Sequence, residues 1–330
     1  MTPADLSLTV QHAVRRAVDD GALRVDVLPR VKVEKARPGG VGEYASNVAL
    51  SLARPAGRPA LDVASVLKER LVGADGILAV DITGPGFLNF TLRPDGGAEL
   101  VAAVRAAGLA YGRGDALAGE VVRFEPPAEA RARVVVECLV GLVRGQGGDA
   151  GVADGGERPH VHPGAYETER LGTDAARWRL LRAAPHDRPL DGPPLLVRHE
   201  RNALFRVQYA HSRARRLLVN GAHLGVLPSY EGEGQAEGEG QAEAGHALAG
   251  LLRDHPGVLL SAARHRGPDR VARHLEAVAD ALLGFQHTVL PLGDEKPSAA
   301  HRSRLALAEA AGTVLAGGLS VLGISAPDRI

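Results

Sequence analysis

Basic and aromatic residues recur at alternating spacings of three and four within the stretch 202–220, NALFRVQYAHSRARRLLVN. On a helix with 3.6 residues per turn, this spacing places their side chains along one side, where three guanidinium groups and an aromatic ring would face solvent together. Guanidinium groups bind phosphate, and an aromatic ring offers a surface on which a base can stack. The pattern therefore indicates a docking face for phosphates. This polar stripe consists of Arg206, Tyr209, Arg213, Arg216 and Asn220.

The opposite side of the same helix is apolar and predicts a buried face. Its one polar member, His211, is expected to be a core histidine with internal hydrogen-bond partners. An ordinary solvated helix, with arginines selected for helix propensity, would show the same spacing, and the spacing alone favours that simpler interpretation. The choice between the two therefore depends on other features of the chain. The apolar stripe consists of Leu204, Val207, His211, Ala214 and Leu218.

The string VQYAHSRARRLL, which begins at Val207, resembles the opening helix of the all-helical anticodon-binding domain of arginyl-tRNA synthetases, the domain named for its Asp-Ala-Leu-Arg (DALR) motif. The tail RLALAEAAGTVLAGGLSVLGISAPDRI, which ends at Ile330, resembles the end of the same domain. Upstream, GEYASNVALSLA at 42–53 and GPGFLNFTL at 84–92 resemble the small N-terminal domain of these enzymes. The resemblance implies that the polar stripe contacts tRNA, with its arginines on phosphates and Tyr209 stacked on a base or a ribose of the anticodon loop.

The hydrophobic pattern of residues 1–110 predicts a compact α+β domain. A helix with an apolar face comes first, short strands surround Pro29, and a hairpin closed by the turn 83–86 comes last. The expected elements are a helix over 6–17, strands over 25–28 and 31–34, helices over 44–53 and 61–71, and strands over 77–82 and 87–92.

The matching domain of the synthetases touches the elbow of the tRNA, and the resemblance assigns this contact to Phe87, Asn89 and Phe90. Successive residues of a strand point to opposite faces of a sheet. We therefore expect at least one of the two phenylalanines to pack in the core of the domain.

Residues 111–200 resemble an eroded α/β remnant of the catalytic domain. The segment 120–148 resembles the first catalytic strand and helix, but the His-x-Gly-His signature is absent, and the sequence in its place, 126–131, reads PPAEAR. The segment 171–185 resembles the helix that leads out of the catalytic domain, and the Lys-Met-Ser-Lys loop that should precede it is missing. The resemblance implies that the active site has been lost.

The length of this middle part supports the same interpretation. A doubly wound nucleotide-binding sheet needs two halves built from βαβ units of at least about 30 residues each. Much of the segment 113–200 is unsuited to strands, because 145–156 is glycine-rich and 185–194 is proline-rich. We predict that 145–156 is a flexible loop.

Other chemistry is weakly indicated. His160 and His162 lie in a glycine-rich segment without a carboxylate at fixed spacing, so chance is favoured over a metal site. The segment 295–298, EKPS, weakly resembles a Lys-x-Ser loop, but it lies in the C-terminal helical part of the chain, where that loop is not expected. The sequence contains no phosphate-binding G-x-x-x-x-G-K-[ST] loop. Cys138 lies in an apolar run and is predicted to be a core thiol. We expect no catalytic residue, no cofactor and no bound metal.

Residues 201–330 predict an all-α bundle of the DALR type that carries an acidic insert. The insert, 231–243, repeats glycine, glutamate, glutamine and alanine, and we predict that it is disordered. Without it, this part of the chain has about six more basic than acidic residues, although the whole chain has a formal net charge of +0. Such a local excess attracts RNA. Further helices are expected over 246–253, 271–289 and 305–322.

Composition limits the cellular setting. The single cysteine excludes an internal disulfide framework, so we expect a cytoplasmic protein. The N-terminus lacks the pattern of a signal peptide, and we find no apolar run of membrane length. We therefore expect neither a membrane nor DNA as a partner.

The sequence as a whole predicts a pseudoenzyme related to arginyl-tRNA synthetases, which binds tRNA, in particular the arginine isoacceptors, without aminoacylating it. One alternative is a functional, ATP-dependent arginine–tRNA ligase. Another is a protein-interaction module that has lost RNA binding and docks onto a synthetase or another translation factor.

Overall fold

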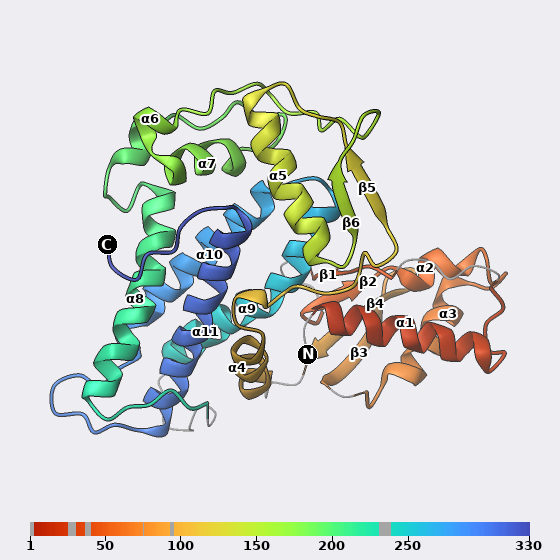
Figure 1. The fold of residues 1–330 in the computed structure, drawn as a ribbon. Helices are drawn as coiled ribbons and strands as arrows, with labels where there is room; N and C mark the ends of the chain where they lie inside the picture. The colour runs from red at the N-terminus through yellow and green to blue at the C-terminus, as the bar shows by residue number, and fades with distance from the viewer. Residues whose placement is uncertain (1–2, 26–30, 37–40, 75, 93–95, 231–238) are drawn as a thin grey trace. The chain divides into compact units, whose positions relative to one another are not determined.

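The computed structural model describes residues 3–25, 31–36, 41–74, 76–92, 96–230 and 239–330, and Figure 1 shows its ribbon. The chain divides into two compact units, 1–99 and 100–330. This division differs from the predicted boundaries at 110 and 200, because residues 111–200 pack with the helical part as one unit. The middle segment therefore belongs to the C-terminal unit and is not a domain of its own.

The N-terminal unit is built around a four-stranded antiparallel sheet in the order β1-β2-β4-β3. The helices bury their apolar sides against it, and α1 contributes residues spaced by three and four, as the sequence predicts. The predicted α+β class of this unit is confirmed. Its elements are α1 (Pro3–Asp19), β1 (Val33–Lys35), β2 (Tyr44–Ser46), α2 (Val48–Ala53), α3 (Ala60–Leu71), β3 (Ile77–Thr83) and β4 (Phe87–Leu92).

The predicted hairpin is confirmed in β3 and β4. The backbone N–H of Gly86 donates to the carbonyl of Thr83 at 3.3 Å and closes the turn. Gly84 and Gly86 have φ angles of 53° and 129°, which side chains other than glycine rarely adopt. The turn residues therefore fix the register of the hairpin. The strand expected over 25–28 lies mostly outside the described residues.

Residues 44–53 do not form the single helix that their periodicity predicts. Tyr44–Ser46 form β2, which pairs with β4, and the helix begins only at Val48. The Ser46 hydroxyl donates to the carbonyl of Lys32 at 2.7 Å and lies 3.3 Å from the Val48 nitrogen, so it ends the strand locally. The prediction was wrong because pairing with a distant strand outweighs local periodicity.

The middle segment contains one parallel βαβ unit, formed by β5 (Val121–Phe124), α5 (Ala130–Gly145) and β6 (Asp149–Val152). The strand and the helix expected within 120–148 are confirmed. The second strand, β6, lies within 145–156, so the prediction that this segment is a flexible loop was wrong. The glycines before it serve close packing instead: a Cβ on Gly148 would lie 2.7 Å from Cγ1 of Val143.

Two short helices, α6 (Thr168–Leu171) and α7 (Thr173–Arg182), join the βαβ unit to the bundle. Arg182 forms a bidentate ion pair with Glu276 of α10, with nitrogen–oxygen distances of 2.5 and 2.9 Å. Arg177 donates to the carbonyl of Leu322 at 2.9 Å. These buried or half-buried contacts explain why the middle segment and the bundle form one unit.

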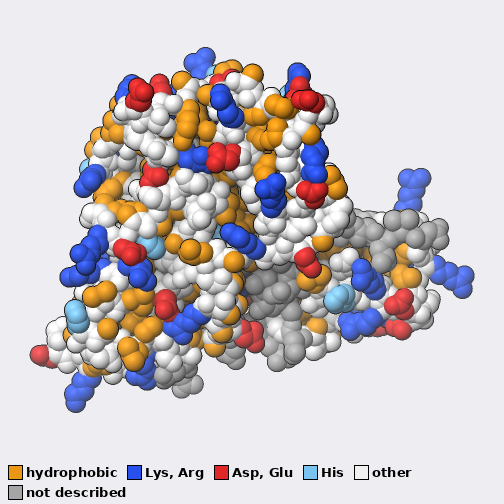
Figure 2. Space-filling view, viewed as in Figure 1, with side chains coloured by type: hydrophobic (Ala, Val, Ile, Leu, Met, Phe, Trp, Pro, Cys, Tyr) orange, Lys and Arg blue, Asp and Glu red, His pale blue; other side chains and the backbone are white. Residues whose placement is uncertain are grey.

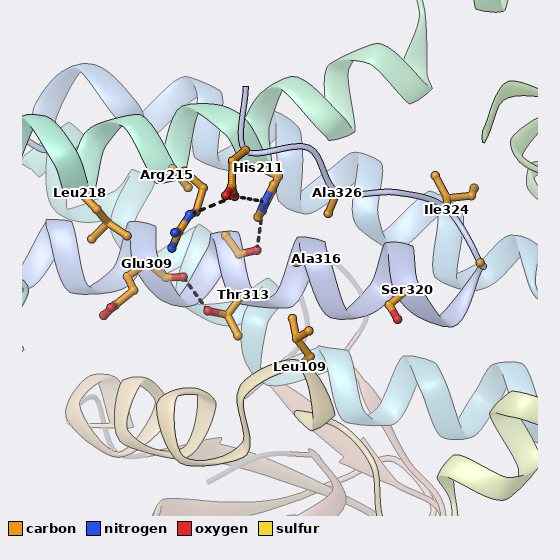
Figure 3. A pocket seen from close by; sticks show the side chains of 14 residues that line it. Leu109, His211, Arg215, Leu218, Glu309, Thr313, Ala316, Ser320, Ile324 and Ala326 are labelled. Atoms are coloured by element: carbon orange, nitrogen blue, oxygen red, sulfur yellow. Dashed lines mark hydrogen bonds and ion pairs between the residues drawn. The ribbon is translucent and has the colours of Figure 1, made fainter. Parts of the chain in front are cut away.

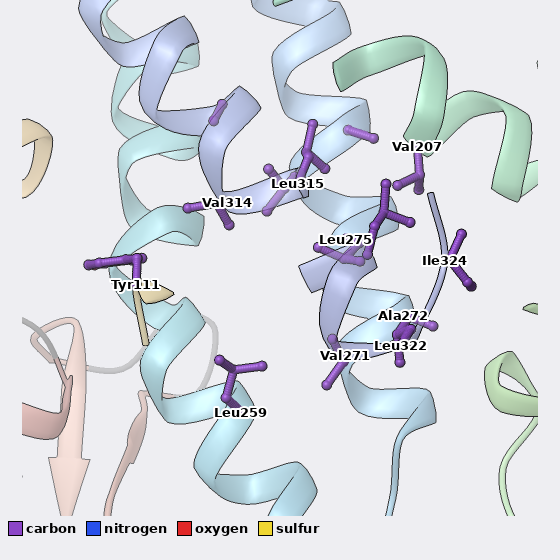
Figure 4. Packing of buried hydrophobic residues seen from close by; sticks show 14 of the residues in the cluster. Tyr111, Val207, Leu259, Val271, Ala272, Leu275, Val314, Leu315, Leu322 and Ile324 are labelled. Carbon is purple, nitrogen blue, oxygen red and sulfur yellow. The ribbon is translucent and has the colours of Figure 1, made fainter. Parts of the chain in front are cut away.

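The bundle has α11 at its centre, in contact with α8, α9 and α10. Figure 4 shows the apolar side chains of these helices packed around Leu275 and Leu315. The predicted helical bundle is thus confirmed, although the helix expected over 271–289 ends earlier and continues as a 3-10 turn. The remaining elements are α4 (Gly96–Ala107), η1 (Gly108–Ala110), η2 (Pro193–Leu196), α8 (Ala203–His223), α9 (Glu239–Arg264), α10 (Asp269–Phe285), η3 (Gln286–Thr288) and α11 (Ala299–Val321).

Two features of the bundle qualify the sequence predictions. Helix α9 begins at Glu239, inside the insert predicted to be disordered, and residues 231–238 lie outside the described part of the chain. Among the described helices, α11 is long and apolar enough to cross a membrane, with a mean hydropathy of 1.2 in its most apolar stretch. That stretch is 72% buried, as in the core helix of a bundle.

Candidate nucleic-acid interface

Helix α8 is anchored at its first turn by Asn202. The side-chain oxygen of this residue accepts a hydrogen bond from the Phe205 backbone N–H at 3.2 Å, which satisfies one of the N–H groups that a helix start leaves unpaired. Its side-chain nitrogen donates to the carbonyls of Leu195 and Val197, at 2.8 and 3.0 Å. One buried side chain therefore fixes both the start of α8 and the segment that precedes it.

The predicted apolar stripe of α8 is confirmed. Leu204, Val207, His211 and Ala214 are buried, and Leu218 is half-buried. The imidazole of His211 has internal partners, as expected: its Nδ1 lies 3.0 Å from the carbonyl oxygen of Gly312, and its Nε2 lies 3.5 Å from Oδ1 of Asp328.

Arg206 and Arg213 are turned toward α10 and η3. Arg206 pairs with Asp280 at 2.6 Å and donates to the carbonyl of Glu200 at 2.8 Å, and Nε of Arg213 donates to Oε1 of Gln286 at 2.6 Å. Both side chains are half-buried. This corrects the expectation that three arginines are equally available to phosphate. The buried face of α8 is wider than the apolar stripe, because the helix packs against both α10 and α11.

The outward face of α8 carries a stacked aromatic pair. The rings of Phe205 and Tyr209 lie 5.8 Å apart at 17°, and Tyr209 is 40% exposed. Arg216 is exposed and forms no hydrogen bond or ion pair with the residues that the structure describes, and Asn220, one turn further, is half-buried. Figure 2 shows basic and apolar side chains intermingled on the side that α8 forms. Phe205 was not predicted as part of this face, although its spacing of four from Tyr209 was a usable signal.

A hollow of about 610 Å³ opens beside Phe205, at the N-terminal end of α8. Its walls come from the start of α7, from the segment before α8 and from the C-terminal segment of the chain. The exposed arginines Arg198 and Arg329 lie on its lining. Its volume falls in the range of small-ligand sites. This hollow could not be predicted from the sequence, because its walls are far apart along the chain.

A second hollow, of about 670 Å³, lies between α8, α11 and the C-terminal segment (Figure 3). At its rim, Asp328 pairs with Arg215 at 3.2 Å and with His211. Glu309, also on its lining, pairs with Arg105. The charged groups that line it are thus paired within the protein, which makes it a weaker candidate for binding phosphate than the outward face of α8.

In the N-terminal unit, β4 places the three predicted elbow residues differently. Phe90 is fully buried in the core, so the prediction that it contacts the elbow of the tRNA was wrong. Asn89 is also buried, and its Nδ2 donates to Oγ1 of Thr83 at 2.7 Å, which ties the two strands of the hairpin together. Phe87 is 39% exposed and remains available for contact. Strand alternation explains the opposite directions of Phe87 and Phe90.

Comparison with known proteins identifies both ends of the chain. The DALR anticodon binding domain matches residues 207–330, which cover most of α8 and all that follows it. The arginyl tRNA synthetase N terminal domain matches residues 6–92, within the N-terminal unit. The chain carries an arginyl tRNA synthetase N terminal domain and a DALR anticodon binding domain.

Whole-protein comparisons point to the same enzymes. An arginine–tRNA ligase of Frankia alni is 40% identical over 202 residues, which are 58% of this chain and 35% of that protein. An arginine–tRNA ligase of Micrococcus luteus is 45% identical over 130 residues, 38% of this chain and 23% of that protein. The chain thus spans about a third or less of the length of these relatives. The arginyl-tRNA synthetase of Thermus thermophilus shares the fold, with a TM-score of 0.68, 13% identity and full coverage of both chains.

The start of α5 contains part of the sequence 126–131, PPAEAR, which the resemblance predicts to stand in place of the His-x-Gly-His signature. Here the Glu129 carboxylate accepts hydrogen bonds from the backbone N–H groups of Arg131, Ala132 and Gly164, at 2.8, 3.1 and 3.0 Å. Burial by itself would raise the pKa of Glu129, but these donors outweigh it and hold the pKa below its ordinary value. The helix start is therefore capped by the protein's own carboxylate.

Arg131 is fully buried beside this cap. Burial lowers the pKa of its guanidinium, and the group is stabilised by five backbone carbonyls. Its accepting carbonyls belong to α7, to the segment before α6 and to the segment after α7, so the arginine holds these parts against α5. The acceptors are the carbonyls of His162, Leu180, Ala183, Ala184 and Asp187, at distances from 2.7 to 3.0 Å.

The other residues considered for chemistry have structural surroundings. Burial raises the pKa of the Cys138 thiol to about 12, which confirms a core thiol. Nδ1 of His160 and Nδ1 of His162 each lie 3.0 Å from a backbone carbonyl oxygen. Within the described residues, no group of three or more His, Cys, Asp or Glu is arranged to hold a metal ion.

Proposed function

We propose that this protein binds tRNA through the outward face of α8, and that it does so without aminoacylating the tRNA. The observation that carries the proposal is the stacked pair of Phe205 and Tyr209 beside the basic hollow at the start of α8. A stacked aromatic surface binds unpaired bases, and nearby arginines bind the phosphates that connect them. An anticodon loop presents both groups in this form.

The identity of the RNA follows from the matched domains. The C-terminal match is an anticodon binding domain, and the relatives are arginine–tRNA ligases. We therefore propose tRNA, and the arginine isoacceptors in particular, as the partner of this face. Arg216, Arg198 and Arg329 supply exposed positive charge around it.

The absence of aminoacylation is proposed from the start of α5. A nucleotide site at a helix start needs backbone N–H groups that can reach phosphate. Here the Glu129 carboxylate accepts hydrogen bonds from the backbone N–H groups at the helix start, and the Arg131 guanidinium donates to backbone carbonyls. Between the matched domains, the described residues form a single βαβ unit, whereas a doubly wound sheet needs two larger halves.

Two variants test two kinds of RNA contact, base stacking and phosphate binding. Tyr209→Ala should weaken tRNA binding by about 1 to 3 kcal/mol with little change in salt dependence, since stacking releases no counterions. Arg216→Gln should lower the slope of log affinity against log salt by roughly 0.9 or less, because one phosphate contact is lost. Arg133→Gln, which removes the same charge from an exposed position of α5, is the matched control. Affinity is measured by filter binding at several salt concentrations.

The outcomes separate the alternatives. A folded double variant of Tyr209 and Arg216 that binds tRNA like the wild type would contradict the proposal and favour a protein-interaction module. The exposed apolar side chain of Leu109 beside the second hollow is the observation that favours such a module. ATP–pyrophosphate exchange above background, in a preparation that binds tRNA, would show a functional ligase. We expect tRNA binding without exchange.

A further inference from the structure

The side chain of Asp174, in the first turn of α7, lies where three elements meet. Its Oδ1 accepts a hydrogen bond from the backbone N–H of Ser325 at 3.1 Å, and its Oδ2 accepts one from the Ser325 hydroxyl. The same Oδ2 accepts a bond from Nε2 of Gln208, on α8, at 2.9 Å. One carboxylate from the catalytic remnant thus binds both α8 and the C-terminal segment.

Gln208 completes this junction. Its Nε2 also donates to the carbonyl oxygen of Ser325 at 3.0 Å. The backbone of Ser325 is therefore held on both its N–H and its carbonyl side, and Ile324 just before it is buried. The residues after it are exposed or half-buried, so their position depends on such bonds more than on apolar packing.

The segment held in this way is a wall of the hollow beside Phe205. Ser325, Pro327, Arg329 and Ile330 line the hollow, as does Asp174. If the junction were lost, the segment after Ser325 would be held to α8 only through Asp328, by its contacts with Ser212, Arg215 and His211. The wall of the hollow formed by Ser325 and Pro327 would then be less firmly placed, and ordering it during binding would cost affinity.

We propose that Asp174 is a positioning residue of the RNA-binding face, which fixes the C-terminal wall of the hollow before RNA arrives. The inference rests on the proposed RNA binding and assigns a role to the catalytic remnant in it. The carboxylate repels phosphate, so its charge alone works against RNA binding. A positioning role and a simple charge effect therefore predict opposite results when the charge is removed.

The first experiment measures tRNA affinity of the full chain. Asp174→Asn keeps the shape but turns an amide N–H₂ toward the Gln208 donor, and it should weaken binding roughly tenfold, about 1.4 kcal/mol. The salt slope should stay unchanged, because no phosphate contact is lost. Asp294→Asn removes the same charge from an exposed loop residue and should leave binding unchanged or slightly tighter. Ser325→Ala, which leaves the first turn of α7 intact, should weaken binding a few-fold.

The second experiment tests the position of the chain end without RNA. The chain has four isoleucines, Ile77, Ile82, Ile324 and Ile330, so labelling isoleucine with ¹⁵N gives a simple NMR spectrum. In the wild type, the heteronuclear NOE of Ile330 should show an ordered amide. In Asp174→Asn it should fall, because the segment after Ser325 then keeps only the contacts of Asp328 with α8. The values of Ile77 and Ile82, in the N-terminal unit, should not change.

The two readouts keep this inference distinct from the proposed function. If the wild type binds no tRNA, the proposed function fails, and an unchanged Ile330 signal in the variant would overturn the positioning role as well. If the wild type binds tRNA and a folded Asp174→Asn binds equally or more tightly, the positioning role is overturned and RNA binding stands. Weaker binding together with a mobile Ile330 supports the proposal.

Discussion

The outward face of α8 and the start of α5 use similar residues for opposite purposes. Both are helical sites with arginines, and both lie in the C-terminal unit. At α5, the guanidinium of Arg131 is fully buried and donates to five carbonyls of the protein. On α8, Arg216 is exposed and forms no hydrogen bond or ion pair within the described part of the chain. The first site is closed by the protein itself, whereas the second remains open to a ligand.

This difference shows that the availability of a charged group, more than its type, decides whether it can bind a ligand. An arginine on a helix is suitable for phosphate in both places. At α5, burial and internal hydrogen bonds occupy the donors of Arg131, and a group that already has its partners gains little from a phosphate. Arg206 and Arg213 are intermediate cases, since each is half-buried with one side-chain partner on α10 or η3.

The largest expected effect comes from breaking the closed site. Arg131→Met leaves several buried carbonyls without donors and should lower the free energy of unfolding by about 3 to 5 kcal/mol, as for other broken buried charge networks. Arg216→Met, the matched control on the open site, should change stability by less than about 0.5 kcal/mol. Urea denaturation measures both. Equal stability of the two variants would contradict the contrast between the sites.

A second closed site is the histidine stack inside the bundle. The ring of His255 lies between Tyr111 and His274, at centroid distances of 6.1 and 5.3 Å. Burial, and then the neighbouring His274, lower the pKa of His255 to about 3. Because the folded pKa lies below the unfolded value of about 6.5, the neutral ring contributes stability above pH 6.5, and this contribution is lost as the pH falls toward 3.

The expected loss between pH 7 and pH 4 is about 3 kcal/mol. His255→Phe keeps an aromatic ring in the stack but cannot take up a proton, so its stability should fall less over the same range. The measurement is the difference in the free energy of unfolding between wild type and variant, followed by denaturation at each pH. Parallel curves for the two proteins would show that His255 becomes protonated without cost.

The salt dependence of tRNA binding distinguishes an arginine that is already paired, such as Arg206, from the exposed Arg216. Arg206→Gln removes a guanidinium already paired with Asp280, so the salt slope of tRNA binding should change by clearly less than the roughly 0.9 expected for Arg216→Gln. The ion pair is partly exposed, and its loss should cost stability of at most about 1 kcal/mol. Equal slopes for the two variants would mean that Arg206 leaves Asp280 when RNA binds.

The smallest effect is expected from the acidic insert. Deleting 231–243 removes five glutamates from the chain without removing an apolar residue larger than alanine. The deletion also removes 239–243, the start of the 26-residue helix α9, so the melting temperature should fall only slightly. Binding of tRNA at low salt should become slightly tighter, because less negative charge repels the RNA. At high salt, wild type and variant should bind alike. Weaker binding after the deletion would assign the insert a positive role.

The sequence by itself determined most element types and the buried side of α8, and the resemblance of its motifs indicated the two flanking domains. The element types follow from local periodicity and turn residues, as in the hairpin closed by Gly84 and Gly86, whose backbone few other residues can adopt. Phe87 and Phe90 also follow a local rule, since alternate strand positions face opposite sides. Even so, the rule could not say which of the two rings is buried.

Only the tertiary structure decided which polar groups are free. Arg206 and Arg216 share one stripe on a helical projection, but Asp280, on α10, pairs with the first. The strand β6 likewise forms in a glycine-rich segment because β5 supplies its hydrogen-bond partners. Asp174 and Ser325 lie far apart along the chain, and their contact arises when α7, α8 and the chain end pack together. Sequence spacing describes neighbours along one element, whereas the partners of a polar side chain come from whichever elements pack beside it.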